Sequence, residues 1–143
     1  KMDMEKLREC IGKSASYSRT VGESDVYLFG GISGDLHQNH YDEAFMQKTQ
    51  FKHRIAHGML VASYMSSAGS LLNDRMEWHT VSYGYDRIRF IKPVFIGDTL
   101  LCTETVTRVD DDGKYFADVT AVNQDGVLVA VATHVSKFID VQE

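Results

Sequence analysis

The chain has 143 residues, which is enough for one compact domain and too few for two ordinary ones. Hydrophobic residues make up 43% of the sequence and charged residues 24%, a balance that excludes an intrinsically disordered chain. The formal net charge of −5 argues against broad nucleic-acid binding, which requires a basic surface. It leaves room for a small phosphorylated ligand held by a local basic patch.

Cysteine content and hydropathy bear on cellular location. The 2 cysteines are too few for a disulfide framework and suit a reducing compartment. No stretch approaches the ~20 apolar residues of a membrane-spanning helix, and no targeting segment is visible at the start. We therefore expect a cytoplasmic protein with a single domain over residues 2–143 and with neither a membrane nor a nucleic acid as a partner.

The first half of the chain has helical punctuation. Ser14–Thr20 predicts a short strand. Gly22, followed three residues later by Asp25, predicts the start of a helix. Tyr41–Thr49 predicts a second, short helix with acidic residues in its first turn. A longer helix is predicted over His57–Leu72, and we expect it to be buried because it is apolar on every side.

The second half is rich in the β-branched and aromatic residues that favour strands. Four strands are predicted, over Thr80–Lys92, Asp98–Val109, Lys114–Asn123 and Val127–Val141. The turns Asp110–Gly113 and Asn123–Gly126 join neighbouring strands tightly, so these strands must be antiparallel. We expect an α+β fold in which the sheet curls around the long helix, and pairing of two sheets edge to edge in a dimer.

Titratable side chains gather between residues 33 and 58: Asp35, His37, His40, Asp42, His53 and His57. Residue types alone leave two interpretations equally open. In the first, Gly34 and Asp42 form helix caps and the histidines satisfy carbonyl groups at helix ends. In the second, Asp35 and His40, five residues apart across a non-helical connection, share a water molecule. An imidazole, with its ordinary pKa of about 6.5, can accept a proton from that water near neutral pH.

The residues His57-Gly58-Met59 open the long helix, where free N–H groups and the positive end of the helix dipole gather. Because Gly58 has no Cβ, a substrate carbonyl could approach its N–H closely. Such a donor would form an oxyanion hole for a developing enolate.

These segments resemble a known family. ISGDLHQNHYDEAF (residues 32–45) followed by RIAHGML (54–60) is similar to the signature of the MaoC-like (R)-specific enoyl-CoA hydratases. RFIKPVFIGDTL (89–100) resembles a second stretch of that family, and the likeness runs from about Tyr17 to Phe138. It implies a hot-dog fold, a long helix wrapped by an antiparallel sheet, assembled as a homodimer or a dimer of dimers.

The resemblance also implies an activity in fatty acid metabolism. The enzyme would be a hydro-lyase (hydratase or dehydratase) that converts a trans-2-enoyl-CoA reversibly to an (R)-3-hydroxyacyl-CoA, with no metal and no cofactor besides the CoA of its substrate. Asp35 and His40 match the catalytic pair that activates water, and Gly58 matches the glycine whose N–H binds the thioester oxygen. Further substrate contacts are expected at Ser33, His57 and Met59.

One departure from the family pattern lies between the catalytic pair. The family commonly has Asn-Pro two and three residues before the histidine, where this chain has His37 and Gln38. Loss of the proline could loosen the loop, because proline fixes φ. The added imidazole of His37 could contact the substrate.

Three alternatives stay open. Histidine pairs, His37 with His40 and His53 with His57, could bind a metal ion together with Asp35. The same fold could carry an acyl-CoA thioesterase or a non-catalytic acyl-CoA-binding domain.

Positive charge near the end of the first long strand is a further candidate feature. Arg87, Arg89 and Lys92 could bind CoA phosphates, although strand alternation places Arg87 and Arg89 on one face and Lys92 on the other. We favour a solvated surface for all three. His134 has no partner visible in the sequence, so we expect a structural role for it.

Overall fold

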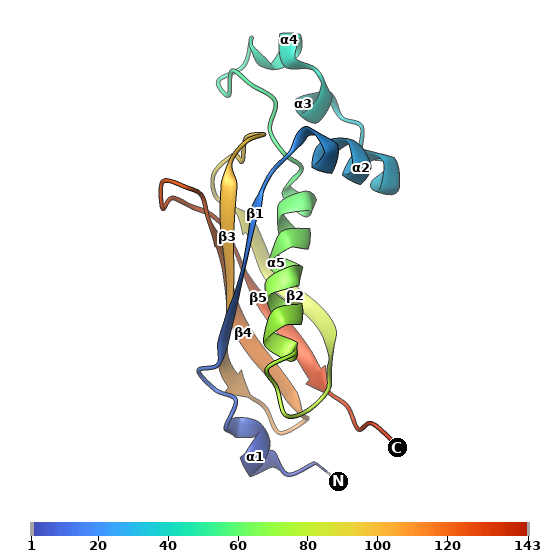
Figure 1. Ribbon diagram of the computed structural model, residues 1–143, viewed down its shortest axis with the longest axis vertical. Coiled ribbons are helices and arrows are strands. Elements are labelled where there is room, and N and C mark those ends of the chain that lie inside the picture. Colours follow the sequence, from blue (N-terminus) through green and yellow to red (C-terminus); the bar gives the residue numbers. More distant parts are fainter. Residues whose placement is uncertain (1, 143) are drawn as a thin grey trace.

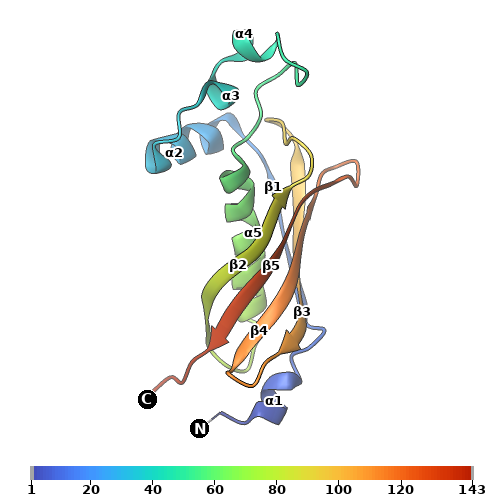
Figure 2. The same ribbon diagram turned by 180° about the vertical axis from the view of Figure 1, so that it is seen from behind.

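A five-stranded antiparallel sheet and one long helix form the body of the computed structural model, which describes residues 2–142 (Figure 1). The expected domain limit at Glu143 lies outside the described residues. The strand order is β1 (Ser14–Thr20), β3 (Thr99–Val109), β4 (Lys114–Val122), β5 (Leu128–Phe138) and β2 (Thr80–Phe90). Helix α5 (Gly58–Asn73) lies along one face, and the view from behind shows the opposite face without a helix over it (Figure 2). The expected α+β, hot-dog arrangement is confirmed.

Short helices lie at the two ends of the sheet. Helices α2 (Glu23–Ser33), α3 (Gln38–Tyr41) and α4 (Glu43–Met46) gather at the end where α5 begins. Helix α1 (Met4–Arg8) lies at the other end and was not predicted, since five residues are too few to show a helical period. Among the described residues, no helix combines the length and the apolar character needed to cross a membrane.

The start of α2 agrees with the sequence prediction. The Asp25 carboxylate accepts a hydrogen bond from the Gly22 N–H at 3.2 Å, and α2 ends at Gly34 in the left-handed conformation (φ 80°). The carboxylate of Asp25 also accepts from Arg19 (2.5 and 3.0 Å) and from the Tyr64 hydroxyl (2.8 Å). Hydrogen bonding to Arg19 lowers the pKa of Asp25 to about 2. This buried carboxylate therefore ties α2 to β1 and α5.

The single helix expected over Tyr41–Thr49 is wrong. The chain forms two one-turn helices, α3 and α4, separated at Asp42, whose backbone is extended (φ −114°, ψ 90°). The Asp42 carboxylate accepts from the N–H of Phe45 at 2.9 Å and starts α4. An aspartate that bonds to the backbone ahead of it favours a cap over a helix interior, and this explains the break.

Helix α5 is buried on one side only, which corrects the expectation of burial all round. Its sheet-facing residues are Leu60, Val61, Tyr64, Met65, Ala68, Gly69 and Leu72. On its outer side Met59 is 56% exposed and Leu71 40%, with Ser63, Ser66 and Ser70 exposed beside them. One curled sheet can cover only one side of a helix, so a side of α5 with serine and apolar side chains stays open in the single chain.

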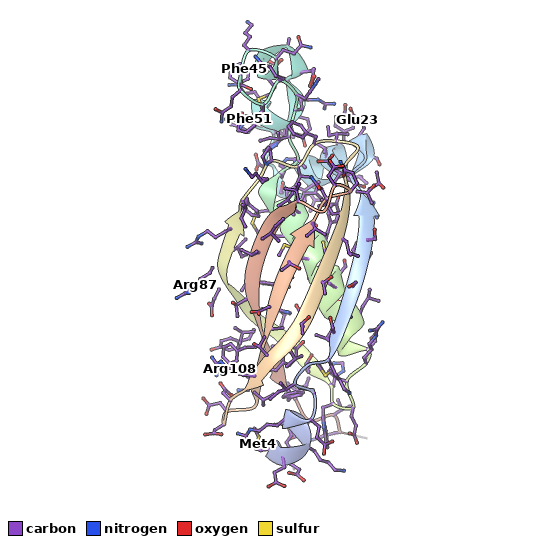
Figure 3. All side chains as sticks on the ribbon, turned by 90° about the vertical axis from the view of Figure 1, so that its left-hand side faces the viewer. Met4, Glu23, Phe45, Phe51, Arg87 and Arg108 are labelled. Atoms are coloured by element: carbon purple, nitrogen blue, oxygen red, sulfur yellow. The ribbon has the colours of Figure 1, made fainter. Side chains whose placement is uncertain are left out.

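The edge strand β2 is irregular. Its register against β5 shifts between Ser82 and Gly84 and again between Asp86 and Arg89. Arg87, inside the second shift, has φ 54° and projects from the edge of the sheet (Figure 3). The simple alternation expected for Arg87 and Arg89 therefore does not hold, because a bulge resets which face each residue takes.

Candidate active site

The His40 ring is oriented by the segment that precedes α5. His40 lies in α3 and is 9% exposed, and its Nδ1 is 2.7 Å from the carbonyl oxygen of Ile55. A carbonyl only accepts, so Nδ1 carries the proton and Nε2 presents a lone pair. Burial, helped by the neighbouring His57 imidazole, lowers the pKa of His40. The ring is thus a neutral proton acceptor at pH 7.

Asp35 and His57 complete a cluster around that ring. The His57 imidazole is buried and stacks on His40, with ring centroids 3.8 Å apart and an interplanar angle of 26°. His57 Nε2 donates to the backbone oxygen of Asp35 at 2.8 Å. One carboxylate oxygen of Asp35 and one nitrogen of each ring lie within 4.8 Å of one another. A water molecule between Asp35 and His40 would be in reach of both.

The loop between α2 and α3 is held by local hydrogen bonds. Ser33 Oγ donates to the Phe29 carbonyl (2.7 Å) and accepts from the Asp35 N–H (3.1 Å). His37 Nδ1 accepts from the Asn39 N–H (3.2 Å) and caps α3. The His37 cap supplies an anchor in this loop, which contains no proline. For Ser33 and His37 a contact with substrate stays a prediction.

His40 and Gly58 line the same cleft, whose volume is about 340 Å³. Gly58 is the first residue of α5, so its N–H has no acceptor within the helix. A Cβ on Gly58 would lie 2.5 Å from the Phe90 ring, closer than real contacts allow. Lys92 also lines this cleft, whereas Arg87 and Arg89 do not.

A second cavity of about 320 Å³ is almost wholly apolar and lies where the exposed side of α5 meets the edge strand β2. Met59 and Phe29 line it near the start of α5, and the Phe29 ring packs edge-on against His57 at 4.8 Å between centroids. Met59 therefore faces this cavity rather than the cleft that holds His40.

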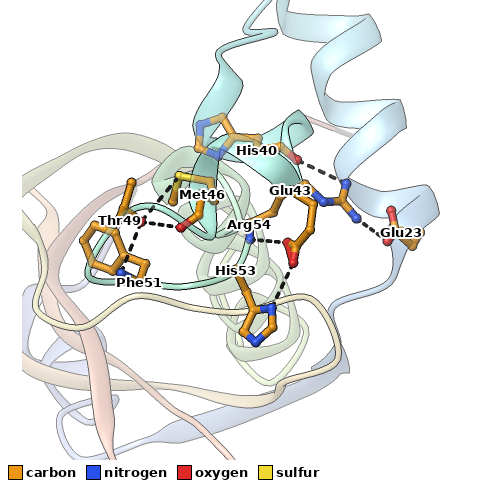
Figure 4. A network of polar contacts seen from close by, with 8 residues as sticks. All are labelled: Glu23, His40, Glu43, Met46, Thr49, Phe51, His53 and Arg54. Atoms are coloured by element: carbon orange, nitrogen blue, oxygen red, sulfur yellow. Dashed lines mark hydrogen bonds and ion pairs between the residues drawn. The ribbon is translucent and has the colours of Figure 1, made fainter.

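Arg54 ties the segment that carries His40 to α2, and sequence reasoning missed it (Figure 4). Its guanidinium donates to the carboxylate of Glu23 and to the His40 carbonyl (3.3 Å). Its backbone N–H donates to Glu43 at 2.8 Å, and the other oxygen of Glu43 bonds His53 at 2.9 Å. The hydrogen bond from His53 lowers the pKa of Glu43. The only signal in the sequence was an arginine at the head of RIAHGML.

The histidine pairs considered as metal ligands do not form, because His37 caps α3 and His53 pairs with Glu43. Asp35, His40 and His57 are the described residues that could hold an ion. However, imidazole lone pairs lie in the ring planes, and the two stacked rings are only 26° from parallel. Lone pairs so arranged do not converge on one ion at Zn–N distances of about 2 Å. The geometry suits a water molecule better than a metal ion.

Comparison with known proteins identifies relatives of this chain. Residues 9–127 match the model of the MaoC like domain. An (R)-specific enoyl-CoA hydratase of Rhodospirillum rubrum is 42% identical over 104 residues, covering 73% of this chain and 70% of the relative. That of Aeromonas caviae is 31% identical over 121 residues, covering 85% and 88%. The solved structure of the (R)-hydratase from A. caviae, 30% identical, superposes with a TM-score of 0.80 over 90% of this chain and 96% of that one.

Proposed function

This chain belongs to the family of MaoC-like domains, and we propose that it hydrates a trans-2-enoyl-CoA thioester to an (R)-3-hydroxyacyl-CoA and catalyses the reverse dehydration. Its relatives in R. rubrum and A. caviae bear the name of that activity. The observation that carries the proposal is that His40 and Gly58 line the same cleft, with the carboxylate of Asp35 close to the His40 ring.

In this proposal His40 and Asp35 activate the water. The Nε2 lone pair accepts a proton from the water as its oxygen attacks C3 of the enoyl group. The Asp35 carboxylate accepts the second hydrogen bond of the water and orients it. The same pair returns a proton to C2 on the same face, which completes the addition. A positioned base of this kind contributes about 10²–10⁴ in rate.

The Gly58 N–H supplies the electrophilic half of the reaction. It donates to the thioester oxygen, where negative charge develops as C3 is attacked. Helix α5 adds the positive end of its dipole at the same point. Because 16 residues of helix stand behind this N–H, the donor is fixed before substrate arrives. The reaction needs no group beyond the protein and the CoA of its substrate.

The two cavities suggest how an acyl-CoA lies in the site. The apolar cavity, lined by Met59 and Phe29, suits the acyl chain, because it offers few polar partners. Lys92 at the wall of the cleft is placed to meet a negatively charged part of the substrate. Arg87 and Arg89 are assigned to the solvated surface.

We also propose that two copies assemble. In the described chain, β2 is an open edge of the sheet and the outer side of α5 exposes Met59 and Leu71. A second copy would cover both features. Light scattering coupled to gel filtration should give a mass of two chains or four, and a monomer at working concentration would contradict this assembly.

A panel of enoyl-CoAs tests the activity. Hydration removes the conjugated thioester, so its absorbance falls without release of free thiol. A thioesterase would instead release CoA thiol, which a disulfide reagent detects. A binding domain would bind the acyl-CoA and leave both signals unchanged. Either of the latter outcomes, across chain lengths, would refute the proposed hydration.

A further inference from the structure

His57, the residue that precedes α5, is the most enclosed side chain of the cluster that it forms with Asp35 and His40. It is 1% exposed, and it is absent from the walls of both cavities described above. A side chain this enclosed acts on a reaction only through its neighbours. Its contacts lead to the two groups assigned to water activation, the backbone of Asp35 and the ring of His40.

The hydrogen bond from His57 holds the segment that carries Asp35. Residues 34–37 form an exposed connection without regular structure between α2 and α3. The other hydrogen bonds of Asp35, to Ser33 and His37, stay within this part of the chain. Among the described residues, the bond from His57 Nε2 to the Asp35 carbonyl oxygen (2.8 Å) is the one that joins Asp35 to the start of α5. This bond therefore limits where the Asp35 carboxylate can lie.

The ring of His57 also supports the proposed base. It stacks on His40 with centroids 3.8 Å apart, and Phe29 packs edge-on against it at 4.8 Å. His57 is in addition joined by a peptide bond to Gly58, the assigned donor to the thioester oxygen. One residue thus connects the three groups that the proposed reaction uses.

One nitrogen of His57 is unpaired, which argues against a role in stability alone. Nε2 donates to a carbonyl, so Nδ1 of the neutral ring is an acceptor. This Nδ1 is buried and has no hydrogen-bond partner among the described residues. The buried His134, in contrast, has Glu104 Oε1 at 2.6 Å from one nitrogen and Ser82 Oγ at 2.8 Å from the other. Because an unpaired buried acceptor lowers stability, an apolar side chain would serve packing as well as His57 does.

We propose that His57 is a positioning residue: its Nε2–H holds the Asp35 segment and its ring supports His40, so that one water molecule meets both groups. This inference rests on the hydratase activity proposed above. The water must contact the Asp35 carboxylate and His40 Nε2 at the same time. A displacement of about 1 Å in such a site costs about 10²-fold in rate. Loss of the bond from His57 frees the exposed Asp35 segment to move, while the cleft that binds substrate keeps its walls.

Two substitutions separate positioning from packing. His57→Gln keeps an N–H donor at the same number of bonds from Cα as Nε2, so it still reaches the Asp35 carbonyl. His57→Leu is apolar and of similar size, and it removes the donor together with the unpaired nitrogen. We expect His57→Leu to lose about 10²-fold in kcat with little change in KM or Tm, and His57→Gln to recover most of that loss. His79→Leu, which removes an exposed histidine beyond the other end of α5, should match the wild type.

Backbone dynamics give a second measurement, which needs no substrate. Nitrogen-15 order parameters for residues 35–37 should be about 0.85 in the wild type and in His57→Gln, and should fall toward about 0.6 in His57→Leu. A residue that only fills space would leave these values unchanged when leucine replaces it.

The outcomes distinguish this inference from the proposed function. Wild-type protein that hydrates no enoyl-CoA overturns both. An active wild type together with a folded His57→Leu variant of wild-type kcat, or with unchanged order parameters in that variant, overturns only the role of His57. If His57→Leu does not fold, His57→Gln against His57→Asn decides it. Asparagine carries the same amide on a side chain one methylene shorter, which does not reach Asp35, so equal kcat in these two variants overturns the proposal.

Discussion

Replacing His40 by alanine tests the base of the proposed hydration most directly. The substitution removes the Nε2 lone pair while the cleft and the Gly58 N–H remain. Loss of a positioned base should lower kcat by about 10²–10⁴. At 1.36 kcal/mol for each factor of ten, this is about 3–5 kcal/mol of barrier. The lost bond to the Ile55 carbonyl should cost about 1–2 kcal/mol of stability, which leaves the domain folded.

The pH profile adds a second measurement on His40. The reaction needs the neutral imidazole, and burial holds the pKa of His40 below its ordinary value of about 6.5. Wild-type kcat/KM should therefore persist below pH 6.5 and fall only as the pH drops through the lowered pKa of His40. Asp35→Asn should also lower kcat strongly without unfolding the protein. His53→Ala, which removes an exposed histidine from outside the cleft, is the control. A His40→Ala variant with near-normal kcat would refute the assigned base.

Three further outcomes are expected. Gly58→Ala should lower kcat/KM by about 10²-fold while Tm changes little, since the exposed Phe90 ring can move but the thioester oxygen loses its close approach; an unchanged kcat/KM would contradict the assigned donor. Asp25→Asn should lower the free energy of unfolding by about 2 kcal/mol in chemical denaturation, less than for a fully buried ion pair because Arg19 is 43% exposed. The stability that ionised Asp25 contributes is present above its unfolded pKa of about 3.8 and lost as the pH falls through about 2, so the two proteins should differ less in acid than at pH 7. Treatment with EDTA should leave the hydration rate unchanged. If EDTA abolished the rate and zinc restored it, the site would hold a metal ion and not a water molecule.

The sheet and the long helix could be predicted because their patterns are local. Turn residues such as Asp110–Gly113 mark strand ends, and an uninterrupted apolar run marks the helix. The break at Asp42 was missed because a side chain that caps a new helix looks, in sequence, like an acid in the first turn of an existing one. The exposed outer side of α5 was missed because composition does not say how many sides a sheet covers.

The candidate site was predictable only in part. Asp35, His40 and Gly58 stand out by motif, and the structure brings them to one region. The stacking of His57 on His40 depends on how two segments meet, which no local pattern encodes. The pairing of Glu104 with His134 joins residues 30 positions apart on strands that are not even neighbours in the sheet. Such contacts follow from topology and pleat direction, so a single sequence hides them.

The two register shifts in β2 have a consequence for behaviour at high concentration. A long, flat strand at a sheet border offers its free amides to any similar strand and can seed fibrous aggregates. Here the border is kinked twice within eleven residues, and a cationic side chain stands out at the second kink. A regular strand from a foreign or misfolded chain cannot pair along the whole of this irregular edge. It restricts the border to partners of matching shape and so guards the protein against open-ended polymerisation.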